Sequence, residues 1–475
     1  MSQTVTQSAS RIVIIGGGPA GYEAALVAAQ LGASVTVVER DGLGGACVLY
    51  DCVPSKTFIA SSDAATAFGN GDALGVMACE PEDVRINAPA VHGRVKGLAL
   101  AQSADVRSKM SAAGVEVVSG TARLDAAGSA GRLHRVRVEP VGGDSYEVDA
   151  DVVLLATGAA PRIIAGAEPD GERILTWRDV YDLPELPTHL VVVGSGVTGA
   201  EFASAYLAMG VQVTLVSSRD RVMPHEDSDA ANLIEQVFTR RGMTILKNAR
   251  AQAVRRKGEG IVVELADGRT VEASHALMTV GSVPNTADLG LAEAGVAVGP
   301  GGFVTADRVS RTNVSGIYAA GDCTGVLMLA SVAAMQGRIA MWHALGEAVS
   351  PLKLRTVSAN VFTDPEIATV GVGQTTVDAG EVPARTVTLP LSTNARAKMQ
   401  GLTDGFVKLY CRPASGLVIG GVVVASRASE LILPIALAVE NHLTVDQIAH
   451  TISIYPSLSG SITESARQLM QHEFE

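Results

Sequence analysis

The sequence predicts an α/β protein with two parallel-sheet domains and an α+β domain at its C-terminal end. Two glycine-rich turns, Gly16–Gly21 and Gly194–Gly199, each follow a short β-branched run and precede an alanine-rich helical segment. From about Leu352 the pattern changes, because strand-like and helical runs alternate there without such a turn. The chain has 475 residues, of which 47% are hydrophobic, which is enough for about three domains with their own cores.

The composition limits which partners the protein is expected to bind and in which cellular compartment it is expected to lie. The 37 basic and 49 acidic residues give a net charge of −12, which disfavours nucleic acid or an anionic membrane surface as the main partner. Five cysteines are too few for a secreted disulfide scaffold of this length. The start Met1–Ser10 has no basic residue and the apolar run Ile12–Ile15 is short, so neither a signal peptide nor a membrane span is expected. We therefore expect a cytoplasmic protein.

The first glycine-rich turn predicts a dinucleotide site. Ile12–Ile15 is typical of a buried parallel strand, Tyr22–Leu31 of a helix, and Ser34–Val38 of a second strand that ends at Glu39. Glycines permit a tight turn and close approach to a pyrophosphate, which the following helix N-terminus stabilises. Glu39 stands where an acid meets an adenosine ribose hydroxyl. The residues expected to bind this dinucleotide are Gly16, Gly18, Pro19, Ala20, Gly21, Glu39 and Arg40.

The pattern recurs with one difference. The strand Leu190–Val193 leads into Gly194–Gly199, then a helix over Ala200–Met209 and a strand over Gln212–Val216. No acid follows this second strand, where residues 217–221 read Ser-Ser-Arg-Asp-Arg. An arginine accepts a ribose 2′-phosphate that a carboxylate repels, which favours NADPH over NADH. The alternative is an ordinary solvated turn beside bound NADH. The expected site residues are Gly194, Gly196, Val197, Thr198, Gly199, Ser217, Ser218 and Arg219, with Arg221 close by.

Two such units imply two dinucleotides, and FAD with a nicotinamide coenzyme is the natural pair because a hydride passes between them. Thr312–Asp322 supports FAD, since its strand runs into a Gly-Asp turn that places Asp322 to bond a ribityl or pyrophosphate group. Ala156–Pro161 and Val280–Asn285 are typical of crossovers by which the chain enters and leaves the second nucleotide domain. These segments add the following expected cofactor-binding residues: Ala156, Thr157, Gly158, Gly281, Gly321, Asp322 and Ala330.

The predicted domain boundaries follow from these motifs. Residues 1–155 and 282–351 are expected to form an FAD-binding domain, residues 156–281 an NAD(P)-binding domain, and residues 352–475 a dimerisation domain. The nine histidines and the scattered Cys79, Cys323 and Cys411 show no metal-ligand spacing, so no metal is expected.

The stretch Gly44–Lys56 contains two cysteines, Cys47 and Cys52, five positions apart. On an ideal helix their Cα atoms would lie roughly 8.7 Å apart. A disulfide needs less than about 7 Å. A bridge therefore requires a bent helix, and Pro54 favours a break because it lacks the N–H that would bond the Tyr50 carbonyl. A strained, reducible pair is a better candidate for redox chemistry than for scaffolding. The cofactor-binding residues expected in this stretch are Gly45, Ala46, Cys47, Cys52 and Lys56.

Together these blocks resemble the pyridine nucleotide–disulfide oxidoreductases, the family of lipoamide dehydrogenase, glutathione reductase and mercuric reductase. The resemblance covers nearly the whole chain and rests on both glycine fingerprints, the C-x4-C-x-P-S-K stretch and the Gly-Asp turn. It implies a homodimer in which NAD(P)H reduces FAD from one face while the cysteine pair lies on the other. It also implies that Cys52 lies against the flavin and that Cys47 is the outer, exchanging sulfur. By the same resemblance, Lys56 lies near the flavin N5, ion-paired with Glu201.

The chain departs from disulfide-reducing members near its C-terminal end. Those members carry a His-Pro with a glutamate five residues after the histidine, which the partner subunit supplies as a base. Here Tyr455 replaces the histidine and Gly460 the glutamate. A tyrosine with a pKa near about 10 is a poor base at neutral pH. Losing a positioned base typically costs about 10²–10⁴-fold in rate. His450, five residues upstream of Tyr455, is the other candidate base.

This departure favours an acceptor that needs no proton transfer through a thiol. Cys52–Ala60 and the Tyr455 region resemble the lipoamide-dehydrogenase-like NAD(P)H quinone reductases of actinobacteria, which implies electron transfer from reduced FAD to a quinone. Because Cys47 is present, dihydrolipoamide dehydrogenase or a reductase of low-molecular-weight disulfides is the alternative. A flavin-bearing adaptor without enzymatic activity is a third class, which both intact nucleotide loops disfavour. The expected catalytic residues are Cys47, Cys52, Lys56, Glu201 and Tyr455.

Overall fold

The computed structural model describes residues 9–69, 71–76, 85–126 and 133–470. The chain forms two compact units, and each unit is built from three separate stretches. Unit 1 comprises Met1–Thr57, Gly93–Arg162 and Ser282–Lys353, and unit 2 comprises Phe58–His92, Ile163–Gly281 and Leu354–Glu475.

A seven-stranded sheet with the order β17-β6-β1-β2-β3-β4-β5 forms the centre of unit 1. The strands from β17 to β3 are parallel, and β4 and β5 extend the sheet in antiparallel pairing. All four residues of β6 are buried, which explains its continuous apolar run. The strands are β1 Arg11–Ile15, β2 Ser34–Glu39, β3 Glu116–Ala126, β4 His134–Pro140, β5 Tyr146–Ala150, β6 Val152–Leu155 and β17 Ile317–Ala319.

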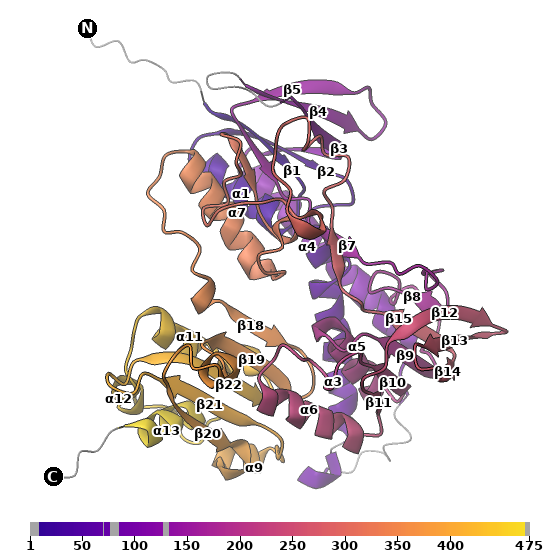
Figure 1. The fold of residues 1–475 in the computed structure, drawn as a ribbon, viewed down its shortest axis with the longest axis vertical. Coiled ribbons are helices and arrows are strands. Elements are labelled where there is room, and N and C mark those ends of the chain that lie inside the picture. Colours follow the sequence, from indigo (N-terminus) through magenta and orange to yellow (C-terminus); the bar gives the residue numbers. More distant parts are fainter. Residues whose placement is uncertain (1–8, 70, 77–84, 127–132, 471–475) are drawn as a thin grey trace. The chain divides into compact units, whose positions relative to one another are not determined.

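Helices α1 (Pro19–Gln30) and α7 (Ala330–Ala344) lie side by side in unit 1 (Figure 1). Gly337 permits this close packing, because a Cβ there would lie 2.1 Å from the Ala20 carbonyl oxygen. A two-stranded ribbon joins the predicted crossovers. The remaining elements with residues in unit 1 are α2 Gly45–Leu49, α3 Cys52–Gly69, α4 Ala88–Ala112, β7 Ala159–Pro161 and β16 Ser282–Pro284.

Unit 2 contains a second parallel sheet, with the order β11-β10-β9-β15-β8. A three-stranded antiparallel meander, β12-β13-β14, shares a hydrophobic core with this sheet. The elements are β8 Ile174–Leu175, β9 His189–Val193, α5 Val197–Ala208, β10 Gln212–Val216, α6 Ser228–Arg240, β11 Thr244–Leu246, β12 Ala251–Lys257, β13 Gly260–Leu265, β14 Thr270–Ala273 and β15 His275–Met278.

The C-terminal part of unit 2 is an antiparallel sheet with the order β18-β19-β22-β21-β20, which forms one core with α10, α11 and α13. An antiparallel sheet that shares its core with helices is the α+β arrangement predicted for this part of the chain. The elements are β18 Ser358–Val361, β19 Glu366–Gly371, α8 Gln374–Asp378, β20 Arg385–Pro390, α9 Ala395–Met399, β21 Phe406–Cys411, β22 Val418–Ala425, α10 Ala428–Leu431, α11 Leu433–Glu440, α12 Val445–Ala449 and α13 Gly460–Leu469.

The predicted fold class is confirmed, and the predicted domain boundaries remain predictions. Helices α1 and α5 each begin three residues earlier than predicted, because the end of each glycine motif already forms the first helical turn. The helical run after β22 divides into two helices, α10 and α11. Pro434 explains the division, because it lies at the start of α11, where its missing N–H cannot continue a helix from α10.

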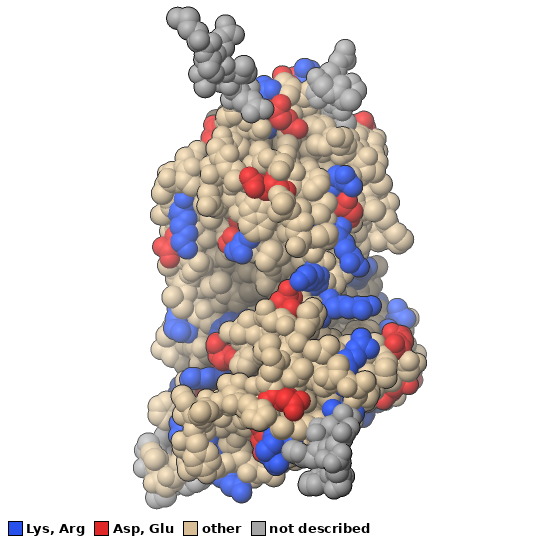
Figure 2. All heavy atoms as spheres, turned by 90° about the vertical axis from the view of Figure 1, so that its left-hand side faces the viewer, with Lys and Arg blue, Asp and Glu red and all other residues tan. Residues whose placement is uncertain are grey.

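The surface shows no single dominant charge on the face drawn in Figure 2, where basic and acidic side chains are scattered in small groups among neutral ones. None of the described helices combines the length and the apolar character needed to cross a membrane.

His275 in β15 makes the folding stability of unit 2 depend on pH. Burial and the neighbouring Arg173 guanidinium lower the pKa of this histidine to about 4. Arg173 Nη1 lies 3.0 Å from His275 Nε2, so a proton there would face a positive charge. Because the unfolded chain takes up the proton near its ordinary pKa of about 6.5, folding stability should fall by about 1 kcal/mol between pH 6.5 and 5.5.

The measurement is thermal unfolding across this pH range. His275→Gln should remove that fall, whereas His442→Asn, at an exposed histidine, should keep it. An unchanged pH dependence in the His275 variant would contradict the assignment.

Candidate functional site

The first glycine turn joins β1 to α1. Gly16 has φ +107°, and a Cβ there would lie 2.2 Å from the Ala156 carbonyl oxygen, so only glycine fits. Gly18 precedes α1 without a side-chain cap, and no other described atom lies within 4 Å of where its Cβ would be. The first turn begins with Pro19, which has no N–H, so the N–H groups of Ala20 and Gly21 are left for an anionic ligand. This arrangement fits the pyrophosphate of FAD.

Glu39 holds the glycine turn at the end of β2. Its Oε2 accepts a hydrogen bond from Gly17 N at 2.6 Å, and its Oε1 accepts hydrogen bonds from Asp41 N at 2.6 Å and Gly42 N at 3.2 Å. The predicted acid thus lies beside the predicted turn, with its carboxylate oriented by backbone donors. Arg40 is 62% exposed and pairs with Asp41. Cofactor contact by Arg40 therefore remains a prediction.

Asp322 follows β17 at the start of a short 3₁₀ turn. Burial and the nearby Asp51 raise the pKa of this carboxyl to about 6. A half-buried carboxyl with an acidic neighbour gains from a hydroxyl or a cationic partner, which fits the predicted bond to a ribityl group. Gly321 N donates to Gln336 Oε1 at 2.8 Å, so α7 holds this turn. Sequence reasoning missed Gln336, because a buried polar residue that bonds a distant backbone group has the same local pattern as an exposed one.

The two predicted crossovers meet in unit 1. Thr157 Oγ1 donates to the Asn285 carbonyl at 2.7 Å, and Asn285 Nδ2 donates to the Thr157 carbonyl at 2.9 Å. Asn285 N also donates to the Gly158 carbonyl at 3.0 Å. Ala156 hydrogen-bonds β1, and Ala330 is the first residue of α7. Gly281, with φ +94°, is the last residue of its stretch in unit 2.

The cysteine pair lies across a helix break. Cys47 is in α2, Cys52 is the first residue of α3, and both are free thiols. Between them, Asp51 N donates to the Ala46 carbonyl at 2.8 Å, a five-residue step in place of the helical four. A hydrogen bond with the Cys47 thiol, together with burial, raises the pKa of the Cys52 thiol, while Lys56 acts in the opposite direction. The predicted interruption therefore brings the sulfurs into contact.

Pro54 permits this break but does not mark its position. It is the third residue of α3, where an N–H has no intrahelical acceptor to lose. The break lies before Cys52, at Tyr50 and Asp51, and includes the Tyr50 carbonyl named in the prediction. Gly44, with φ +93°, and Gly45, with φ +57°, start α2 and leave little room for side chains.

Lys56 and Glu201 lie in different units, so their ion pair stays a prediction. Glu201 is only 4% exposed in α5, and its Oε1 accepts a hydrogen bond from Phe362 N at 2.9 Å. This bond ties α5 to the start of the C-terminal sheet within unit 2.

The second glycine turn repeats the geometry of the first. Gly194 has φ +113°, and a Cβ there would lie 2.3 Å from the Thr279 carbonyl oxygen. A Cβ at Gly199 would lie 2.0 Å from the Gly194 carbonyl oxygen. Gly196 precedes α5 without a side-chain cap, and Val197 and Thr198 begin the helix. The helix N-terminus therefore fits a second pyrophosphate.

One of the residues after β10 that were predicted to bind the coenzyme faces the interior of the protein instead. Ser217 is fully buried, and its hydroxyl bonds Ser195 Oγ at 2.7 Å, so it faces the protein. Ser218 and Arg219 are exposed, as expected of residues that meet a ligand. Arg221 is half-buried, and no described residue accepts a hydrogen bond from its Nε. Coenzyme contact by Ser218, Arg219 and Arg221 remains a prediction.

Tyr455 lies in an exposed apolar loop before α13. It is 85% exposed, beside Ile454 at 80% and Ile452 at 98%. The loop borders a cavity of about 400 Å³ that Gly460 also lines. His450 is exposed, and its Nδ1 lies 2.7 Å from the Asp446 carbonyl oxygen, so this nitrogen is already engaged. Tyr455 is therefore accessible to a partner or substrate, and His450 remains a candidate base through its Nε2.

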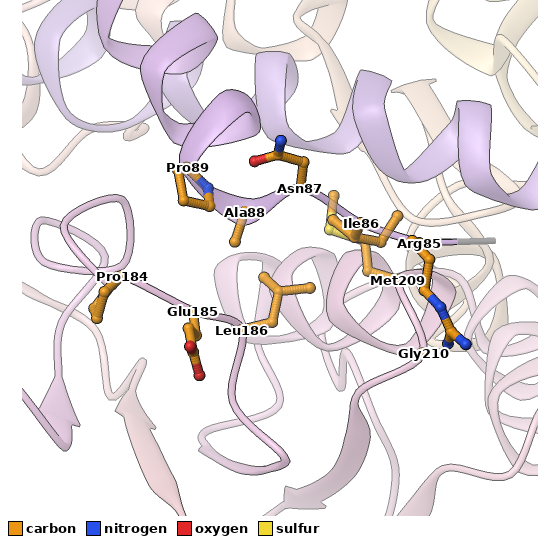
Figure 3. A pocket seen from close by; sticks show the side chains of 10 residues that line it. All are labelled: Arg85, Ile86, Asn87, Ala88, Pro89, Pro184, Glu185, Leu186, Met209 and Gly210. Atoms are coloured by element: carbon orange, nitrogen blue, oxygen red, sulfur yellow. The ribbon is translucent and has the colours of Figure 1, made fainter. Parts of the chain in front are cut away.

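A second cavity, of about 500 Å³, contains none of the predicted site residues (Figure 3). Its walls come from residues 85–89, residues 184–186, Met209 and Gly210. Their side chains are largely exposed and include one acid and one base, which specifies no ligand. Among the residues that the structure describes, no three His, Cys, Asp or Glu side chains gather as a metal site. Cys79 lies outside the described residues.

Comparison with known families decides the class. The family model described as pyridine nucleotide-disulphide oxidoreductase matches residues 10–337, and the model of its dimerisation domain matches residues 357–466. The chain belongs to this family. The oxidoreductase therefore uses FAD and NAD(P)H and carries a dimerisation domain, which confirms the predicted enzyme class and cofactors.

Relatives of this oxidoreductase are similar over their whole length. An NAD(P)H dehydrogenase (quinone) of Mycobacterium tuberculosis is 60% identical over 467 residues, which cover 98% of this chain and 94% of the relative. The crystal structure of LpdA from Mycobacterium tuberculosis is 59% identical, covers 97% of this chain and 100% of its own, and superposes with a TM-score of 0.93. A dihydrolipoyl dehydrogenase of Zymomonas mobilis is 31% identical and covers 96% of each chain.

Proposed function

We propose that this oxidoreductase passes a hydride from NAD(P)H to FAD and then delivers the electrons to a quinone. The observation that carries the proposal is the loop before α13. It presents an exposed Tyr455 where a disulfide reductase presents a histidine, and Gly460 offers no carboxylate to orient a base. The 60% identical relative named as a quinone dehydrogenase supports the same acceptor. We assign the enzyme to the cytoplasm.

The two glycine turns and a few charged side chains would hold the cofactors and assist the hydride transfer. When bound, FAD supplies the two-electron acceptor for the hydride. The open helix N-termini at Gly18 and Gly196 would hold the two pyrophosphates, and Asp322 would hold the ribityl chain. Lys56, one helical turn after Cys52, would place a positive charge where negative charge develops on hydride transfer, with Glu201 orienting it.

The cysteine pair is a secondary element of the proposed chemistry. A hydrogen bond with Cys47 and burial raise the pKa of Cys52, the sulfur that the family resemblance places against the flavin, so exchange with an external disulfide would fall to Cys47. Without a base near Cys47, exchange with an external disulfide would be slow. Reduction of lipoamide or a small disulfide is the second candidate function, favoured by the contact between the two free thiols.

We propose a homodimer formed through the C-terminal domain. Leu433 and Leu437 lie one turn apart on α11 and are 59% and 52% exposed. The loop with Ile452, Ile454 and Tyr455 adds further exposed apolar side chains to this domain. Such surface is costly in water and is typical of an interface.

The Cys47→Ser variant tests the choice between the two functions. We expect quinone turnover to survive, because the proposed electron path does not pass through Cys47, while any disulfide reduction is lost. The measurement is kcat/KM for menadione and for lipoamide with NADPH as donor. Loss of menadione turnover in a variant that still binds FAD would place the thiol on the path and contradict the proposal.

A further inference from the structure

The backbone of the first nucleotide sheet fixes the position of its acid. Ile15 on β1 pairs with Val38 on β2, and Gly16 N donates to the Val38 carbonyl at 2.9 Å. The residue after Val38 is Glu39, whose carboxylate accepts the hydrogen bond of Gly17 N. Gly17 and Glu39 are thus partners across the turn.

The second sheet has the same backbone pairing. Val193 on β9 pairs with Val216 on β10, and Gly194 N donates to the Val216 carbonyl at 3.0 Å. By this register, Ser217 occupies the position of the acid, and Ser195 occupies the position of its glycine partner. The Gly-Glu pair of the first domain is therefore a Ser-Ser pair in the second.

The Gly-Glu pair and the Ser-Ser pair fill the corresponding space of the two domains with different side chains. In the first domain, a Cβ at Gly17 would lie 3.2 Å from both Cβ and Cγ of Glu39 and 2.8 Å from Leu43 Cδ2. A side chain in the middle of the glycine turn would therefore be crowded against both Leu43 and the acid that follows the second strand. In the second domain, the side chain of Ser195 takes the corresponding space, and Ser217 is short enough to meet it.

The serine pair is buried and organises the loop beyond it. Ser195 is 6% exposed and Ser217 is 0% exposed, and their hydroxyl oxygens lie 2.7 Å apart. Ser217 Oγ accepts a hydrogen bond from Arg219 N at 3.2 Å and lies 3.2 Å from the carbonyl oxygens of Arg219 and Arg221. Asn248 N also bonds the Arg219 carbonyl. The loop is thus fixed from its inner side, which leaves the exposed Arg219 side chain directed outward.

We propose that Ser195 and Ser217 together determine coenzyme choice, because their neutral hydroxyls occupy the space that a ribose-binding acid needs. The site would then accept the 2′-phosphate of NADPH, which the arginines of the loop would bind. This proposal rests on the use of a nicotinamide coenzyme in the proposed function but is independent of the electron acceptor. It assigns specificity to Ser195, a residue inside the glycine turn.

The experiment is isothermal titration of the FAD-loaded enzyme with 2′,5′-ADP and with 5′-ADP, with no electron acceptor present. The wild type should bind 2′,5′-ADP at least about tenfold more tightly, as expected for charge-assisted hydrogen bonds. Ser217→Glu alone should bind both ligands poorly, because its carboxylate meets the Ser195 side chain. The double variant S195G/S217E should prefer 5′-ADP, with a shift of about tenfold or more relative to S217E.

Ser218→Glu is the matched control, because it adds the same charge one position beyond the strand end, at an exposed residue. It should weaken 2′,5′-ADP without strengthening 5′-ADP. Thermal unfolding gives a second readout that needs no ligand: S195G should restore the melting temperature that S217E lowers. Equal binding of both ligands by the wild type, a full switch by S217E alone, or no stabilisation of S217E by S195G would each overturn the proposal. Failure of quinone turnover would leave these results unaffected.

Discussion

Replacing Tyr455 with histidine and Gly460 with glutamate should raise the rate of disulfide reduction by about 10²-fold, at the lower end of the usual contribution of a positioned base. The histidine would supply the proton transfer, because an imidazole exchanges a proton near neutral pH and a phenol does not. Tyr455 is 85% exposed in a loop, and a Cβ at Gly460 would meet only Ser457 Oγ, at 3.5 Å, so the exchange disturbs no packed core in the subunit. The measurement is kcat/KM for lipoamide with NADPH.

Single variants show how much of the gain comes from the histidine itself and how much from the glutamate that orients it. Tyr455→His alone should give a smaller gain than the pair, and Tyr455→Phe should give none. Menadione turnover should change little in all three, since that path needs no base at this position. If the double variant shows no gain while it binds FAD and dimerises, the acceptor pocket rather than the missing base sets the specificity.

Lys408→Met should destabilise unit 2 by about 3–5 kcal/mol, as expected when one member of a buried ionic network is removed. Lys408 is 1% exposed, and its Nζ lies 2.9 Å from Asp227 Oδ2 and 2.6 Å from Asp229 Oδ2. Tyr410 OH also donates to Asp227 Oδ2, at 3.1 Å. Asp227 caps α6, so the network joins the NAD(P)-binding region to the C-terminal sheet.

Thermal unfolding of the variant and the wild type measures this effect. Lys247→Met is the matched control, because Lys247 forms an exposed pair with Glu235, at 2.6 Å, and should cost less than about 1 kcal/mol. A similar loss of melting temperature in both variants would mean that the buried network contributes no more than a surface pair.

The sequence predicted the parts of the fold that local rules determine. Both glycine turns follow a strand and open a helix as predicted, because residues such as Gly16 and Gly194 adopt backbone angles that other residues rarely adopt. The ends of β1 at Ile15 and of β10 at Gln212 and Val216 also match. The apolar runs that predicted these strands are short and bounded, which limits the error in their ends.

Features that depend on distant partners were not predictable. The inward turn of Ser217 depends on Ser195, which is 22 positions away, and the burial of Lys408 depends on Asp227, which is 181 positions away. A polar residue that completes a distant network has the same local pattern as one that meets solvent.

The most direct test of the proposed function is one comparison of electron acceptors. The wild-type enzyme, loaded with FAD and supplied with NADPH, is assayed with menadione and with lipoamide under identical conditions. The account predicts a kcat/KM for menadione at least about 10²-fold above that for lipoamide, because only the disulfide needs the missing base. A kcat/KM for lipoamide equal to or above that for menadione would contradict it.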